Sequence, residues 1–281
     1  MTFLRSLIAI LLLATVQETV IAGSPGSAGA IWSGRSGGFA IDWRPADLNI
    51  SAGGALVISF RALAAKEWMR LRHDAPGQAL AFERSDAVLS AVGPYLSVQE
   101  GTFCDCGGAH PMEVERFRAI DLRDSRPDKP APADLGQIFL PADIFDALMS
   151  DTVVQSALRS SAGELPHSLQ DLVQALAFNA ITKGGCSYFF GNDLLSNFAF
   201  HHLESGKVDI RLSLSHEAES CRGGLIQIGI LLPIPEALRP ALEAAQVKRA
   251  GLLMSDAVSL SKGASSVYRF STAPTTGKRR P

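Results

Sequence analysis

The most constraining feature of the sequence is the stretch from Tyr95 to Arg123, which reads YLSVQEGTFCDCGGAHPMEVERFRAIDLR. Segments with strand-like composition lie on both sides of Gly107 and Gly108. Glycine tolerates the positive φ that a sharp reversal of the backbone needs, and Pro111 fixes φ at the start of the outgoing segment. The stretch therefore predicts a β-hairpin whose connection contains the GGAHP run.

Four cysteines constrain the fold further, and two of them lie in this hairpin: Cys104, Cys106, Cys186 and Cys221. An even number of cysteines in an exported chain predicts disulfides, here two. In an extended strand the Cα atoms of Cys104 and Cys106 would be roughly 6.6 Å apart, near the limit for a direct bridge. We therefore expect two long-range disulfides that join this pair to Cys186 and Cys221, and the sequence leaves open which cysteine pairs with which.

The N-terminal segment has the pattern of an export signal. Arg5 precedes an apolar run, Leu7 to Val16, that is too short to span a membrane comfortably, and Val20 and Ala22 suit a cleavage site. We expect residues 1–22 to be a signal peptide and the protein to be periplasmic or secreted. The alternative is an uncleaved anchor, and only then would the protein be attached to a membrane.

The rest of the chain predicts an α+β fold, with a mostly antiparallel sheet, helices packed on one face and disulfides that stabilise it. Apolar residues recur at helical spacing in 168–181, whereas apolar and polar residues alternate in 208–214, as in a half-buried strand. We expect residues 23–38 to be flexible, residues 39–244 to form one domain and residues 245–281 to be a disordered tail.

Composition excludes one class of partner. The chain has a formal net charge of −2 and a pI near 6.3, without the strongly basic balance of a general nucleic-acid binder. We therefore expect no nucleic-acid partner.

His110 is the residue of the hairpin that is best suited to acid–base chemistry. It could act with Asp105, Glu113 or Asp121 as the acid–base pair of a hydrolase, with Ser97 as a nucleophile. None of these spacings matches a known catalytic motif, so a turn histidine that hydrogen-bonds to the backbone is the favoured interpretation. His110 and Asp121 remain the candidate catalytic residues.

A metal site is a second alternative, because two thiolates and an imidazole, from Cys104, Cys106 and His110, would suit copper. Paired cysteines in an oxidising compartment favour disulfides instead, so we expect neither a metal nor another cofactor. The adjacent His201 and His202 lie in a predicted strand and should point to opposite faces, which would prevent them from forming a two-histidine site.

The hairpin also resembles a known family. Gly107, Gly108, Ala109 and His110, followed by Asp121-Leu122, resemble the signature of the RsiV-like extracellular domain, typified by lysozyme-binding anti-sigma factors. The resemblance covers about residues 80–242. Only six residues precede the apolar N-terminal run, so we expect no cytoplasmic sigma-binding part.

The resemblance implies an exported, non-enzymatic binding module of the cell envelope. Its partner would be a protein, such as a lysozyme-like hydrolase, or a glycan, namely peptidoglycan. The matching residues Gly107, Gly108 and His110 would then belong to the binding region.

Overall fold

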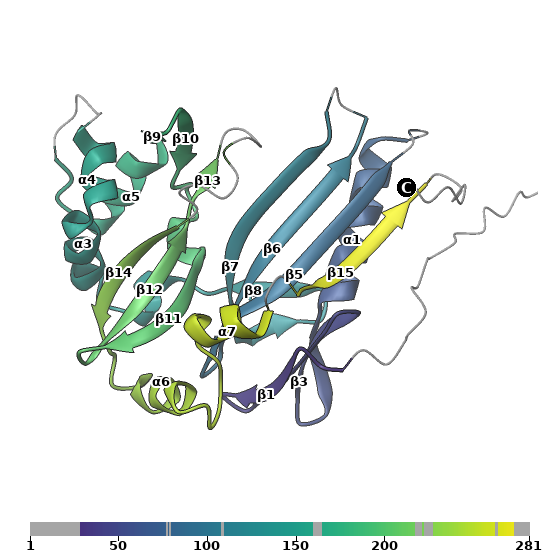
Figure 1. Ribbon diagram of the computed structural model, residues 1–281, viewed down its shortest axis with the longest axis horizontal. Helices are drawn as coiled ribbons and strands as arrows, with labels where there is room; N and C mark the ends of the chain where they lie inside the picture. The colour runs from purple at the N-terminus through teal and green to yellow at the C-terminus, as the bar shows by residue number, and fades with distance from the viewer. Residues whose placement is uncertain are drawn as a thin grey trace, which may run out of the picture.

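The computed structural model describes residues 29–76, 78, 80–107, 110–159, 165–216, 221, 227–261 and 264–272. The expected signal peptide and Gly108 lie outside these residues. The described part is an α+β fold in which helices pack against antiparallel sheets, so the predicted fold class is confirmed (Figure 1). The strands form four sheets rather than one. None of the described helices is both long enough and apolar enough to cross a membrane.

A five-stranded antiparallel sheet contains the predicted hairpin. Its hairpin strands are β6 (Tyr95–Asp105) and β7 (Met112–Arg126), which pair from Tyr95↔Asp121 to Cys104↔Met112. The full order is β15 (Ser266–Ser271), β5 (Ala81–Val92), β6, β7 and β8 (Lys129–Pro132). The predicted β-hairpin is therefore confirmed.

A four-stranded meander precedes this sheet. Its strands, in spatial and chain order, are β1 (Trp32–Ser36), β2 (Phe39–Arg44), β3 (Asp47–Ala52) and β4 (Ala55–Ser59). The prediction that residues 23–38 are flexible is wrong for β1, which pairs with β2 along its whole length. Residues 23–28 lie outside the described part. The strand β1 is stabilised because it pairs with the edge of a sheet that is itself buried. This sheet contributes Trp43, Ile41 and Ile50 to the core.

Helix α1 (Phe60–Asp74) covers the outer half of the five-stranded sheet. The Ser59 side chain caps it by accepting a hydrogen bond from the backbone N–H of Ala62. Trp68 of α1 packs against Phe82 and Phe270, with ring centroids 6.5 and 5.9 Å away. Strand β5 and the much later strand β15 therefore share one aromatic cluster with α1.

The second half of the molecule is built on a three-stranded sheet with the order β11 (Phe198–Glu204), β12 (Lys207–Ser213) and β14 (Gln227–Pro233). One face of this sheet is apolar and packs against helices. A smaller sheet lies beside it, with the order β13 (Ser215–His216), β10 (Cys186–Phe189) and β9 (Ala180–Lys183). The connecting elements are α2 (Leu135–Ile138), α3 (Pro141–Ser150), α4 (Thr152–Arg159), α5 (Leu169–Ala177) and η1 (Leu194–Ser196).

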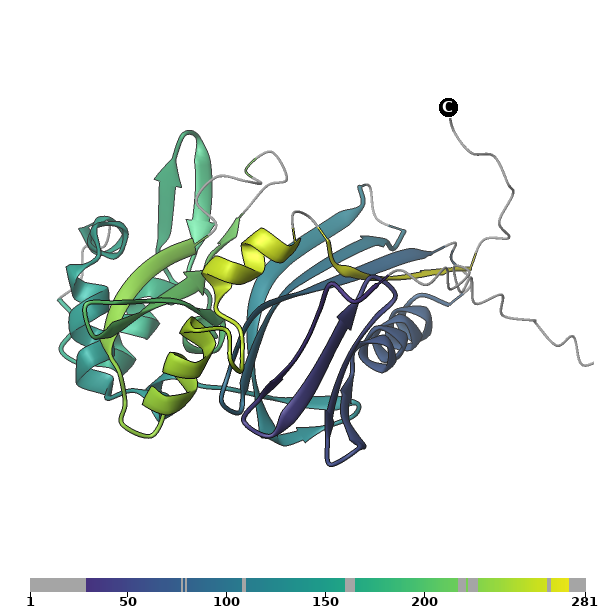
Figure 2. The same ribbon diagram turned by 60° about the horizontal axis from the view of Figure 1, so that its bottom comes forward.

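Two helices contact both the β11–β12–β14 sheet and the five-stranded sheet, which also contact each other directly through β11: α6 (Arg239–Gln246) and α7 (Met254–Ser261), of which α7 lies at the junction of the two sheets (Figure 2). After α7 the chain enters β15, which pairs with β5 from Ser266↔Asp86 to Ser271↔Ala81. The prediction of a disordered tail from residue 245 is therefore wrong for the described residues of this segment. The domain predicted to end at residue 244 includes α7 and β15.

Candidate functional site

The predicted binding residues lie at the tip of the β6–β7 hairpin. Gly107 has a φ of +80°, which confirms the need for glycine there, and Gly108 lies outside the described residues. His110 is exposed in the connection that leads into β7. The tip is therefore an accessible surface.

Asp121 lies at the other end of the hairpin from His110. It is paired with Tyr95, and the distance from Met112 to Asp121 along β7 is roughly 30 Å. Arg123 Nε donates to Asp121 Oδ1 at 2.9 Å. Burial raises the pKa of Asp121, but the hydrogen bonds from Arg123 outweigh burial and hold it below its ordinary value. Asp121 is thus an ion-paired carboxylate, and the structure does not bring it together with His110.

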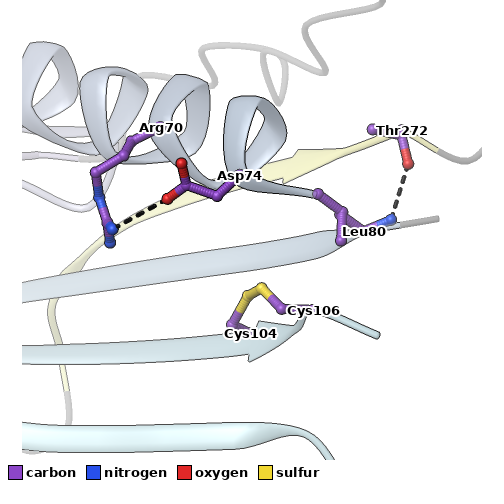
Figure 3. Close-up of a disulfide and its surroundings, with 6 residues drawn as sticks. All are labelled: Arg70, Asp74, Leu80, Cys104, Cys106 and Thr272. Atoms are coloured by element: carbon purple, nitrogen blue, oxygen red, sulfur yellow. Dashed lines mark hydrogen bonds and ion pairs between the residues drawn. A yellow bond between two sulfur atoms is a disulfide. The ribbon is translucent and has the colours of Figure 1, made fainter. Parts of the chain in front are cut away.

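The cysteines pair differently from the prediction. Cys104 is joined to Cys106, with Cα atoms 5.3 Å apart, and Cys186 is joined to Cys221, with Cα atoms 5.5 Å apart (Figure 3). The predicted long-range bridges from the hairpin to Cys186 and Cys221 are therefore wrong. The reason is local, because β6 ends at Asp105 and the Cα atoms of Cys104 and Cys106 lie closer together than in an extended strand.

The disulfides also remove the cysteine ligands of the alternative metal site. All four cysteines are described and none is free. Thiolate is the form of cysteine that binds metal, so Cys104 and Cys106 cannot act with His110 in this state. Cys104 is instead buried with Trp68, Leu80 and Phe82, next to the point where the Leu80 N–H donates to the Thr272 hydroxyl (Figure 3).

The outer end of β7 presents apolar side chains to solvent. Met112 and Val114 are 58% and 41% exposed. They belong to the segment Met112–Glu115, which we call the β7 edge. On the outer side of β7, β8 pairs only from Ile120 onward, so no described strand pairs with the outer side of the β7 edge.

The direction of the β7 backbone is fixed by its neighbours. The Phe117 N–H donates to the Ser213 hydroxyl, and the Ala119 carbonyl accepts from the Ala133 N–H. The backbone N–H and C=O groups of these two residues therefore point away from β6. Because this direction alternates along an antiparallel strand, the backbone of Glu115 faces outward as well. The β7 edge therefore combines outward polar backbone groups with exposed apolar side chains.

A group of charged residues lies inside the protein, between α1 and the five-stranded sheet. Arg84 Nε contacts Asp86 Oδ2 at 2.8 Å, and Arg84 Nη2 contacts Glu100 Oε2 at 2.7 Å. All three residues are at most 3% exposed. Since the group is satisfied internally and closed to solvent, we interpret it as part of the scaffold.

A second polar cluster was not predicted. In β11 the register shifts between Phe200 and His202, so His201 is an extra residue in the strand, a β-bulge. Nδ1 of His201 and Nδ1 of His202 are 2.7 Å apart, and a candidate metal-ligand group comprises both rings and Asp209. The prediction that His201 and His202 point to opposite faces is therefore wrong. The sequence shows only that the two histidines are adjacent. It gives no sign of the extra residue, because the prediction assumes that side chains alternate regularly along the strand.

Comparison with known proteins finds no matching family model, no similar curated protein and no similar solved structure. The functional proposals below therefore rest on the geometry of the molecule.

Proposed function

We propose that the protein is an exported, non-enzymatic binding module of the cell envelope whose partner is a protein. The single observation that carries this proposal is the β7 edge, with its outward backbone and its exposed Met112 and Val114. Export to an oxidising compartment, periplasmic or extracellular, is consistent with the Cys186–Cys221 disulfide. The sequence resemblance to the RsiV-like family motivates a lysozyme-like hydrolase as the first partner to test.

The chemistry of the edge favours a protein over a glycan. A strand edge offers alternating N–H and C=O groups at a spacing that another polypeptide in extended conformation matches. The side chains at positions 112 and 114 lie on one face of the strand and would form a short apolar contact with such a segment. A glycan has no corresponding ladder of backbone groups, so peptidoglycan is the alternative outcome of the test.

The experiment measures retention of the disulfide-intact chain, without its signal segment, on immobilised lysozyme and on purified peptidoglycan. The test variant is Val114→Lys, and Val258→Lys is the matched control because Val258 of α7 is also an exposed valine, at 56%. Burying one valine contributes about 1.5 kcal/mol, so we expect Val114→Lys to weaken lysozyme binding roughly tenfold. Val258→Lys should bind like the wild type.

Two results would overturn the proposal. Retention on neither material would remove the lysozyme-like partner, and retention on peptidoglycan alone would replace the protein partner with a glycan. Equal weakening by Val114→Lys and Val258→Lys would show that the β7 edge is not the contact surface.

A further inference from the structure

The bulge in β11 creates a geometry that a regular strand excludes. In a regular strand consecutive side chains point to opposite faces, whereas at a bulge two residues oppose one residue of the partner strand. Here His201 and His202 oppose Asp209 of β12, and the two imidazole rings lie 4.9 Å apart between centroids at an interplanar angle of 80°. Two imidazoles and one carboxylate therefore converge.

The distances among the three side chains suit one small cation. His202 Nδ1 lies 3.3 Å from Asp209 Oδ2, and His201 Nδ1 lies 3.9 Å from the same oxygen, while the two Nδ1 atoms are 2.7 Å apart. Ligands bound tetrahedrally at about 2.0–2.1 Å are separated by roughly 3.3 Å. The three observed separations bracket that value, so small side-chain rotations suffice to reach it.

The environment of the Asp209 carboxylate also favours a bound cation. Its side chain is only 8% exposed, and its Oδ1 atom is buried without a hydrogen-bond partner. Its other oxygen, Oδ2, pairs with Arg211 Nη2 at 2.7 Å. A buried carboxylate oxygen without a partner is costly, so the described neighbours do not fully compensate the charge of Asp209, and a cation bound between Oδ2 and the two imidazoles would add to that compensation.

The position of Arg211 leaves room for this arrangement. A Cβ atom at residue 229 would lie 2.8 Å from Arg211 Nη1, so the absence of a side chain at Gly229 is what lets the guanidinium lie over β14.

The cluster borders a pocket that leaves one side of it accessible. The pocket has a volume of about 470 Å³ and is lined by both histidines together with residues of α6, α7 and their connection, among them Gln246, Lys248, Ser255 and Asp256. Three protein ligands with an open position are typical of metal sites that exchange water or a small ligand, in contrast to closed structural sites.

We propose that His201, His202 and Asp209 form a binding site for one divalent transition-metal ion of the Zn²⁺ type. Nitrogen and carboxylate ligands of this kind suit Zn²⁺, Cu²⁺, Ni²⁺ or Co²⁺ and not the oxygen-only preference of Ca²⁺ or Mg²⁺. The site is separate from the β7 edge, so it adds to the proposed partner binding and does not depend on it.

The experiment is calorimetric titration of Zn²⁺ into tag-free, metal-stripped protein. We expect one Zn²⁺ per chain for the wild type and an affinity reduced by about tenfold or more in His202→Gln and in Asp209→Asn, since each loses a ligand. The matched control is His73→Gln, because His73 has a 91% exposed side chain outside the cluster and should leave the affinity unchanged. Thermal unfolding without metal verifies that each variant is folded.

A second measurement uses the unmodified protein and so avoids variants that fail to fold. Diethyl pyrocarbonate modifies accessible imidazoles, and mass spectrometry locates the modification. Zn²⁺ should protect His201 and His202 while His73 remains reactive. The proposal is overturned if Zn²⁺ fails to saturate at one per chain, if folded His202→Gln binds as tightly as the wild type, or if Zn²⁺ protects all three histidines equally.

Discussion

Asp86 shows what burial does to a single carboxyl group. It is completely buried, and burial raises its pKa to about 6 although Arg84 lies beside it and opposes the shift. Glu100, in the same group, has a lowered pKa, because Arg84, Arg118 and Arg116 together outweigh its burial. The pKa values of two carboxyl groups on paired strands are therefore shifted in opposite directions.

The raised pKa of Asp86 makes a prediction about pH. A carboxyl group with a raised pKa binds its proton more tightly in the folded than in the unfolded chain, so its contribution to stability increases as pH falls from 7 towards 4. The unfolding free energy of the wild type minus that of Asp86→Asn should therefore increase on acidification, by at most about 3 kcal/mol. Urea unfolding at pH 7, 6 and 5 measures this difference.

Taking a difference between the two proteins removes the contributions of the titrating groups that do not interact with Asp86. As a control, the same difference for Asp128→Asn should not increase on acidification, because Lys66 lowers the pKa of that exposed carboxyl group. A wild-type minus Asp86→Asn difference that stays flat, or that decreases towards pH 5, would contradict the assignment.

At the scale of elements, the two disulfides close loops of very different length. Cys186 and Cys221 are separated by 35 residues in sequence, whereas Cys104 and Cys106 are separated by 2. Since a cross-link stabilises by restricting the unfolded chain, the longer loop should contribute more, about 4 kcal/mol against about 1.5 kcal/mol. The Cys186–Cys221 bridge should therefore contribute more to the unfolding free energy than the Cys104–Cys106 bridge.

This difference predicts an order of stability. The double variant Cys186→Ser/Cys221→Ser should lose more than twice as much unfolding free energy as Cys104→Ser/Cys106→Ser, measured by denaturant unfolding without reductant. Reduced wild-type protein provides the reference that lacks both bridges. Equal losses, or a larger loss from the hairpin pair, would contradict the loop-length argument.

The sequence predicted the elements whose signals are local. Gly107 and the strand-like segments around it predicted the hairpin, and the alternation in 208–214 predicted β12. The sequence did not predict the close approach of Cys104 and Cys106, which depends on where β6 ends, or the extra residue at His201, which depends on the register of β11 against β12. It also missed β15, since a short strand in a Ser-rich segment is stabilised by β5, more than 170 residues earlier in the chain.

For the candidate site, too, local sequence signals predicted some features and missed those that depend on contacts between strands. The hairpin and the oxidised state of its cysteines were predicted, but the pairing of the cysteines was not, and the alternative acid–base pair is excluded because Asp121 is far from His110. The histidine cluster depends on the register of β11 against β12, which no local pattern encodes.

At the scale of the whole molecule, buried hydrogen bonds connect the two halves. The Phe200 N–H of β11 donates to the Ser90 hydroxyl of β5, and the Phe117 N–H of β7 donates to the Ser213 hydroxyl of β12, each at 3.1 Å. The helices α6 and α7 contact strands of both large sheets. The described residues should therefore unfold as one cooperative unit.

The tryptophans allow a direct test of this cooperativity. The chain has three, Trp32, Trp43 and Trp68, and all lie in the half built on the meander and α1. Tryptophan fluorescence therefore reports on that half alone, whereas far-ultraviolet circular dichroism reports on both. We expect the two signals to have the same denaturation midpoint. Two separate midpoints would show that the halves unfold independently.

The position of β15 has a consequence for the order in which the protein can fold. Tyr268 accepts a hydrogen bond from the Leu48 N–H across 220 residues of sequence, and Arg269 pairs with Glu83 across 186. The five-stranded sheet cannot be completed until residues 266–271 have been synthesised. The pairing of β5 with β15 is therefore among the most non-local contacts of the sheet, and we expect the sheet to close late in folding, after its local hairpins have formed.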